Sequence, residues 1–103
     1  MIVVENRLFV AEEYADEFVK RFRDSMGEVE TQPGFVKFEL LTPANSETDS
    51  YISQTYWESM EDFRAWTDTD AFADAHDDHP PEEMFTAPHE LEVHEVAFER
   101  TAE

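Results

Sequence analysis

The spacing of apolar residues changes repeatedly along this chain, and those changes limit the folds it can adopt. From Ile2 to Val10 the residues alternate between two faces, which is typical of a strand. One of these faces is apolar except for Asn6. From Glu12 to about Glu30 the spacing becomes helical and predicts an amphipathic helix. Its apolar stripe comprises Ala15, Phe18, Val19, Phe22, Met26 and Val29.

Three further strands are predicted downstream of this helix. Gln32-Pro33-Gly34 ends the helix, because proline cannot continue its hydrogen bonds and glycine accepts a positive φ. Strands are expected at 35–41 and 50–57, joined as an antiparallel hairpin. The last strand is expected at 90–100, after a loop at 82–88.

Two short helices are predicted between the hairpin and the last strand. Ser59 and Asp62 form a variant of the capping box at the start of the first, which carries Trp66. One of residues 68–69 caps the second, which ends at Pro80-Pro81. The predicted order is β-α-β-β-α-α-β. This is the α+β order of a ferredoxin-like α/β sandwich, in which helices cover one face of an antiparallel sheet.

The other face of the predicted sheet also needs a cover. It is expected to carry some combination of six large apolar residues, which is more apolar surface than a monomer exposes. These are Val3, Phe9, Phe35, Leu41, Tyr51 and Trp57. We therefore expect a homodimer that packs sheet against sheet, as a dimeric α+β barrel, and buries about 800 Å² on each partner.

Acidic residues dominate the composition. With 26 Asp and Glu against 7 Lys and Arg, the formal net charge is −19. Such a surface repels phosphate backbones and anionic lipids, so neither nucleic acid nor a membrane is an expected partner. Lysine is restricted to Lys20 and Lys37. This composition indicates adaptation to a salt-rich cytoplasm, and therefore a halophilic source.

The lack of cysteine narrows the possible chemistry and location. Without cysteine there are no disulfides and no thiolate sites, which favours a cytoplasmic location. The first residues do not resemble a secretory signal, and no apolar run reaches the roughly 20 residues that span a bilayer. We expect neither export nor membrane insertion.

Three residues stand out as candidates for a binding site. Asn6 either bonds a neighbouring loop or points into a ligand pocket between sheet and helices. Trp66 fits simple core packing as well as a pocket wall. His76 fits a satisfied core or surface histidine as well as an axial ligand of haem iron. His76 and His79 have a spacing that can chelate a metal from a helix, but Pro80 makes a zinc site a weak hypothesis.

Three stretches of the chain resemble the IsdG-type haem-degrading monooxygenases of the antibiotic biosynthesis monooxygenase (ABM) superfamily. They are Glu5-Asn6-Arg7-Leu8, Phe63-Arg64-Ala65-Trp66 and Phe72-Ala73-Asp74-Ala75-His76. The resemblance spans almost the whole chain and implies a single ABM domain over 1–103. It also implies a role for each candidate. His76 would be the proximal ligand to haem iron, the Asn6 amide would hydrogen-bond on the distal side, and Trp66 would force the porphyrin out of plane.

The resemblance also implies how the rest of the haem would be bound. Arg21 matches a basic helix position of the family and Arg23 is also available, so either could receive an anionic haem propionate through a charge-assisted bond. The implied enzyme binds haem as both substrate and cofactor, opens the porphyrin ring with O2 and releases iron. It takes electrons from an external donor, so its implied partners are haem and an unidentified reductase.

Two other functions fit the same residues. The first is an ABM monooxygenase that acts on a quinol-like or polyketide-like aromatic without haem. The second is a non-catalytic module that binds or delivers haem. Asn6 and Trp66 suit the haem-degrading enzyme as well as the ABM monooxygenase without haem, whereas an iron ligand at His76 is needed only where haem binds.

The charge balance predicts that the fold is more stable at high salt. The screening length falls from about 8 Å at 0.15 M salt to about 3 Å in molar salt, so repulsion among the carboxylates weakens. We expect the thermal midpoint to rise between dilute buffer and molar KCl by at least ~4 °C, the shift that 1 kcal/mol produces in a domain of this size. Equal midpoints in circular dichroism melts would exclude the halophilic interpretation.

Overall fold

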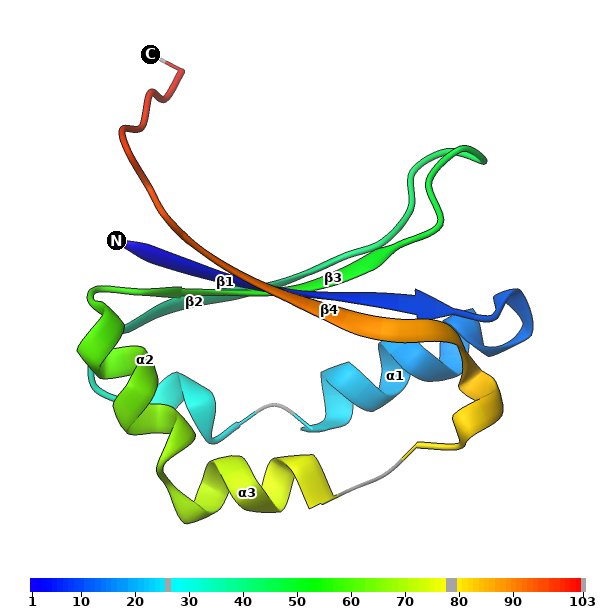
Figure 1. Cartoon of the computed structure of the whole chain (residues 1–103), viewed down its shortest axis with the longest axis horizontal. Helices are drawn as coiled ribbons and strands as arrows, with labels where there is room; N and C mark the ends of the chain where they lie inside the picture. The colour runs from blue at the N-terminus through cyan, green and yellow to red at the C-terminus, as the bar shows by residue number, and fades with distance from the viewer. Residues whose placement is uncertain (26, 78–79, 103) are drawn as a thin grey trace.

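A computed structural model describes residues 1–25, 27–77 and 80–102, without the side chains of 25 and 74–77. Its elements are β1 (Ile2–Val10), α1 (Ala15–Ser25), β2 (Phe35–Leu41), β3 (Tyr51–Trp57), α2 (Met60–Thr67), α3 (Asp70–Asp77) and β4 (Phe85–Glu95). The antiparallel sheet has the order β2-β3-β1-β4, and the helices lie on one side of it (Figure 1). The predicted element order and ferredoxin-like fold are confirmed, as is the hairpin of β2 and β3.

The first helix is shorter than predicted. A 3-10 turn at Glu12–Tyr14 precedes α1, and another at Val29–Thr31 follows it. The helix ends close to Gly27, whose φ of 154° is far from the helical value. The prediction of one helix from 12 to 30 was therefore wrong at both ends, and the predicted core residue Met26 lies outside the described residues. With eleven residues α1 is the longest of the described helices, none of which could cross a membrane.

Side-chain hydroxyl groups start both α2 and α3. The Ser59 Oγ accepts a hydrogen bond from the Asp62 N–H at 3.2 Å and donates one to the Asp62 carboxylate at 2.9 Å. The Thr69 Oγ1 accepts a hydrogen bond from the Phe72 N–H at 3.1 Å. The caps are therefore as predicted, with the second helix capped by Thr69 and not by Asp68.

Gly34 allows α2 to approach the start of β2. Its φ is 80°, and a Cβ at this position would overlap the Asp62 side chain. The Gly34 carbonyl accepts a hydrogen bond from the Glu58 N–H at 2.8 Å, which ties the end of β3 to this turn. The prediction that glycine supplies a positive φ here is confirmed.

The last strand begins and ends earlier than predicted. β4 spans Phe85–Glu95, whereas the alternation predicted a loop at 82–88 and a strand at 90–100. The length of β1 sets these limits, because Val10 and Ile2 lie opposite the two ends of β4. Alternation within a segment cannot show where its partner strand ends, and this is why the prediction was wrong.

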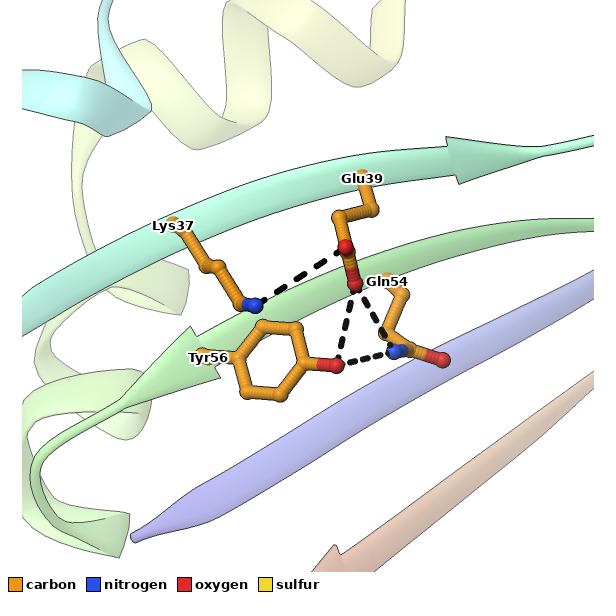
Figure 2. A network of polar contacts seen from close by, with 4 residues as sticks. All are labelled: Lys37, Glu39, Gln54 and Tyr56. Atoms are coloured by element: carbon orange, nitrogen blue, oxygen red, sulfur yellow. Dashed lines mark hydrogen bonds and ion pairs between the residues drawn. The ribbon is translucent and has the colours of Figure 1, made fainter. Parts of the chain in front are cut away.

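The outer face of the sheet, opposite the helices, is more polar than predicted. Three of the six apolar residues expected there face the helices and pack in the core instead, namely Phe35, Tyr51 and Trp57. In this region the outer face carries Lys37, Glu39, Gln54 and Tyr56, whose side chains form a polar network (Figure 2). The expectation was therefore wrong for these three residues, whereas Val3 and Leu41 lie on the outer face as expected.

The network is centred on the Glu39 carboxylate. It accepts hydrogen bonds from the Tyr56 hydroxyl at 3.0 Å and from the Gln54 amide at 3.3 Å, and the Lys37 Nζ lies 3.8 Å from it. The Lys37 Nζ also lies 4.5 Å from the centre of the Tyr56 ring. Partial burial and then the hydrogen bond to Glu39 raise the pKa of Tyr56 above its ordinary value, so this hydroxyl stays protonated and able to donate.

Candidate functional site

The core between sheet and helices consists of two clusters. The α2-side cluster comprises Val4, Val29, Trp57 and Trp66. The α1-side cluster comprises Leu8, Val10, Phe18 and Met84. On β1, Asn6 lies between Val4 and Leu8, and alternation gives all three the same face. Asn6 therefore sits between the two clusters on the face that the helices cover.

The strand register extends this position into a row across the sheet. Asn6 lies opposite Ser53 of β3 on one side and opposite Leu91 of β4 on the other, and Ser53 in turn lies opposite Leu40 of β2. Residues directly opposite each other in antiparallel strands point to the same face. We call Leu40, Ser53, Asn6 and Leu91 the central row. Leu91 is 63% exposed, so the row runs from the packed interior to an open edge at β4.

Asn6 occupies the position that the sequence predicted for it. The amide is half-buried, and among the described residues it has no hydrogen-bonding partner. Thr55, another polar residue on this face, is different because its Oγ1 accepts a hydrogen bond from the Trp57 Nε1–H at 3.0 Å. The alternative was a hydrogen bond from Asn6 to a neighbouring loop, and the described residues contain no such bond. An unpaired amide that is only partly buried between apolar clusters can offer its donors and acceptor to a ligand.

Trp66 packs in the α2-side cluster. It is 8% exposed and belongs to the same cluster as Val4, the core residue that precedes Asn6 on this face of β1. The Phe72 ring of α3 meets the Trp66 ring edge to face, with centroids 5.6 Å apart and planes at 86°. The structure therefore places Trp66 in the cluster on one side of Asn6, where the indole is a core residue.

His76 can be placed along the chain only by its backbone. It belongs to α3, about one helical turn after Phe72, and its side chain lies outside the described residues, as does all of His79. The predicted role of His76 as an iron ligand therefore remains a prediction, as does the weak hypothesis of a zinc site. Among the described side chains there is no group of three or more His, Asp or Glu that could hold a metal ion.

A cavity of about 360 Å³ lies between α1 and β2, next to the central row. Its walls are mostly apolar and include Leu40, which belongs to the row. The Phe22 and Phe38 rings stack across the cavity wall with centroids 6.1 Å apart and planes at 12°. The lining residues are Val19, Phe22, Arg23, Phe38, Leu40 and Thr42. Such a cavity accepts a flat apolar molecule, with a cation available for an acidic group.

The structure separates the two arginines that the sequence left equivalent. Arg23 lines the cavity. Arg21 instead lies 4.0 Å from the Glu17 carboxylate, one turn away on α1, and is not among the lining residues. Of the two, Arg23 is the residue positioned to meet an acidic group in the cavity. Helical periodicity carries part of this signal, because Arg23 lies four residues after the cavity residue Val19 and shares its face of α1, whereas Arg21 points elsewhere.

Comparison with known proteins identifies the family of this chain. The sequence profile of the family described as antibiotic biosynthesis monooxygenase matches residues 1–78. The chain belongs to this family. The matched range contains Asn6, Trp66 and His76, which are the three residues that the resemblance singled out.

Individual relatives have more specific names. A protein of Shouchella clausii (strain KSM-K16) named "Heme-degrading monooxygenase" is 34% identical over 101 residues, which cover 97% of this chain and 94% of that protein. A "Heme oxygenase (staphylobilin-producing)" of Staphylococcus haemolyticus is 40% identical over 78 residues, covering 74% of this chain and 73% of that protein. Among solved structures, MhuD of Mycobacterium tuberculosis, a "heme-degrader" with two hemes bound in its active site, has a TM-score of 0.80 at 34% identity and covers 98% of this chain and 100% of its own.

The setting of Asn6 predicts that its amide is not needed for folding. We expect Asn6→Leu to leave the ligand-free protein as stable as before, or more stable by up to ~1 kcal/mol, because an unpaired amide is removed from apolar surroundings. Thr55→Val is the matched control and should cost about 1 kcal/mol, because the Trp57 N–H loses its acceptor. Urea unfolding measures both. A larger loss for Asn6→Leu than for Thr55→Val would show that the amide is structural.

Proposed function

We propose that this protein is a haem-degrading monooxygenase of the IsdG type, which binds haem through His76, opens the porphyrin ring and releases its iron. The observation that carries the proposal is the unpaired Asn6 amide, held between two apolar clusters and beside an apolar cavity. The relatives named for haem degradation, at 34% and 40% identity, support the same activity.

The residues that line the cavity are chemically suited to parts of a haem. Its flat apolar body suits walls such as Phe22, Phe38 and Leu40, and its acidic propionates suit Arg23. When bound, haem would supply the iron that activates O2, and the porphyrin itself would be the substrate. An external donor would supply the electrons.

The chain's own residues would then bind the haem, orient it and exclude water from it. His76 would hold the haem iron, and the Asn6 amide would offer hydrogen-bond donors to the bound molecule. The buried Trp66 indole, fixed by Phe72, would press on the porphyrin and exclude water from it. Arg23 would hold a propionate at the cavity. Arg21, engaged with Glu17, would contribute less.

Haem titration tests the binding half of this proposal. We expect ferric haem to give a shifted Soret band with the wild type and no such shift with His76→Ala. Arg23→Gln should weaken haem binding by about tenfold, the value of one charge-assisted hydrogen bond, whereas Arg21→Gln should have a smaller effect. A Soret shift that survives in His76→Ala would contradict the proposed ligand. No Soret shift with the wild type would favour an ABM monooxygenase acting on a quinol-like or polyketide-like aromatic without haem.

Turnover of the haem complex tests the catalytic half. With ascorbate in air, the Soret band should bleach even in the presence of catalase, and a ferrous chelator should trap the released iron. A band that stays stable would instead indicate a module that binds or delivers haem. Bleaching that catalase prevents would indicate damage by peroxide and would equally contradict an enzyme.

A homodimer through the outer sheet face is part of the same proposal. The tail after β4 leaves the sheet on the side away from the helices (Figure 1) and carries Phe98, which is 75% exposed, and the outer-face residue Leu41 is 40% exposed. A second copy that covers both would remove apolar surface from water. Sedimentation velocity should show a dimer that Phe98→Asp weakens. A wild-type monomer at every accessible concentration would overturn this arrangement.

The cellular setting follows from composition rather than from the site. We place the enzyme in a salt-rich cytoplasm of a halophile, with a reductase as electron donor. The net charge of −19 and the lack of cysteine support this setting.

A further inference from the structure

Ser53 lies directly opposite Asn6 in the pairing of β1 with β3. Opposed residues of an antiparallel pair have Cβ atoms about 4.5 to 5.5 Å apart and point to the same face. The Ser53 hydroxyl therefore lies beside the Asn6 amide, on the face that the helices cover. The two form a polar pair in the middle of the central row.

The surroundings of this pair are apolar. Leu40 flanks Ser53 in the row, Leu91 flanks Asn6, and the two core clusters lie on either side. Ser53 is half-buried, and like Asn6 it has no side-chain hydrogen bond within the described residues. Because Ser53 is only partly buried, its hydroxyl is free to donate a hydrogen bond to a ligand that lies over the central row.

The position next along the same face shows the contrast. Thr55 follows Ser53 on this face of β3, and its hydroxyl accepts a hydrogen bond from the Trp57 Nε1–H at 3.0 Å. Threonine and valine suit this kind of strand position by propensity, whereas serine does not. Packing and strand propensity therefore account for Thr55 but leave the hydroxyl of Ser53 unexplained.

We infer that Ser53 is a second hydrogen-bond donor of the site, which acts together with Asn6 on a small anionic or polar ligand at the open side of the haem. The inference rests on the proposed function, because it takes haem as the molecule over the central row. It adds a binding residue to that function. Asn6 can offer an amide N–H and Ser53 an O–H to the same atom or to neighbouring atoms of that ligand.

Azide binding to the ferric haem complex tests this inference without turnover. Azide is an anion and needs hydrogen-bond donors, whereas imidazole binds iron as a neutral ligand and serves as the control probe. We expect Ser53→Ala to weaken azide binding by about tenfold and to leave imidazole binding unchanged. Ser53→Thr keeps a hydroxyl on a strand-favouring residue and should retain wild-type azide affinity. Ser46→Ala, in the exposed loop between β2 and β3, is the matched control and should change nothing.

A double variant tests whether the Ser53 hydroxyl donates to the ligand directly, independently of Asn6. Asn6→Ala combined with Ser53→Ala should bind azide more weakly than either single variant, because two separate donors are lost. If Ser53→Ala has no effect once Asn6 is gone, the hydroxyl only positions the amide and the inference is overturned. It is also overturned if Ser53→Ala weakens haem binding itself or destabilises the fold without a selective effect on azide.

The outcomes separate this inference from the function on which it rests. If the wild type gives no Soret shift with haem, the proposed function fails and this inference fails with it. If haem binds as proposed and azide affinity is the same in wild type, Ser53→Ala and Ser46→Ala, only the role of Ser53 is wrong.

Discussion

The pairing of β1 with a neighbour on each side is the constraint on which the rest of this structure depends. Because β1 is hydrogen-bonded to β3 and β4, its central residue is held in the middle of the sheet, and its register decides which side chains stand beside it. That residue is Asn6, which separates two apolar clusters that would otherwise be continuous. The fold thus places a polar group where packing alone would favour an aliphatic one.

Periodicity predicted the element order, the ferredoxin-like fold and the face of Asn6, because these depend on spacing within one segment. It could not predict what depends on two segments. The partner of Asn6 is Ser53 only because of the β1–β3 register. The core position of Phe35, with Lys37 on the other face, results from an irregularity between these residues that breaks the alternation. No feature of a single strand carries that information.

The sequence named candidate members of the site but could not give their arrangement. Trp66 packs in the cluster that contains Val4, two positions before Asn6 on the same face of β1, and resemblance had grouped both with His76. Helical periodicity puts Arg21 and Arg23 on different faces of α1, but only the packing of α1 on β2 shows which face lines the cavity. In a chain with a net charge of −19, a cation at the cavity matters for an acidic ligand because surface charges farther than about 8 Å are largely screened at physiological salt.

The composition of β4 has a consequence for how the sheet can grow. β4 is an edge strand, and such strands can recruit a further strand from another molecule. Here the edge contains Pro88, which lacks an N–H, and the carboxylates of Glu90, Glu92 and Glu95. A second chain that tried to extend the sheet at this border would meet a missing donor and crowded negative charge. The border is thereby protected against fibril-like stacking, even though the open end of the central row lies within it.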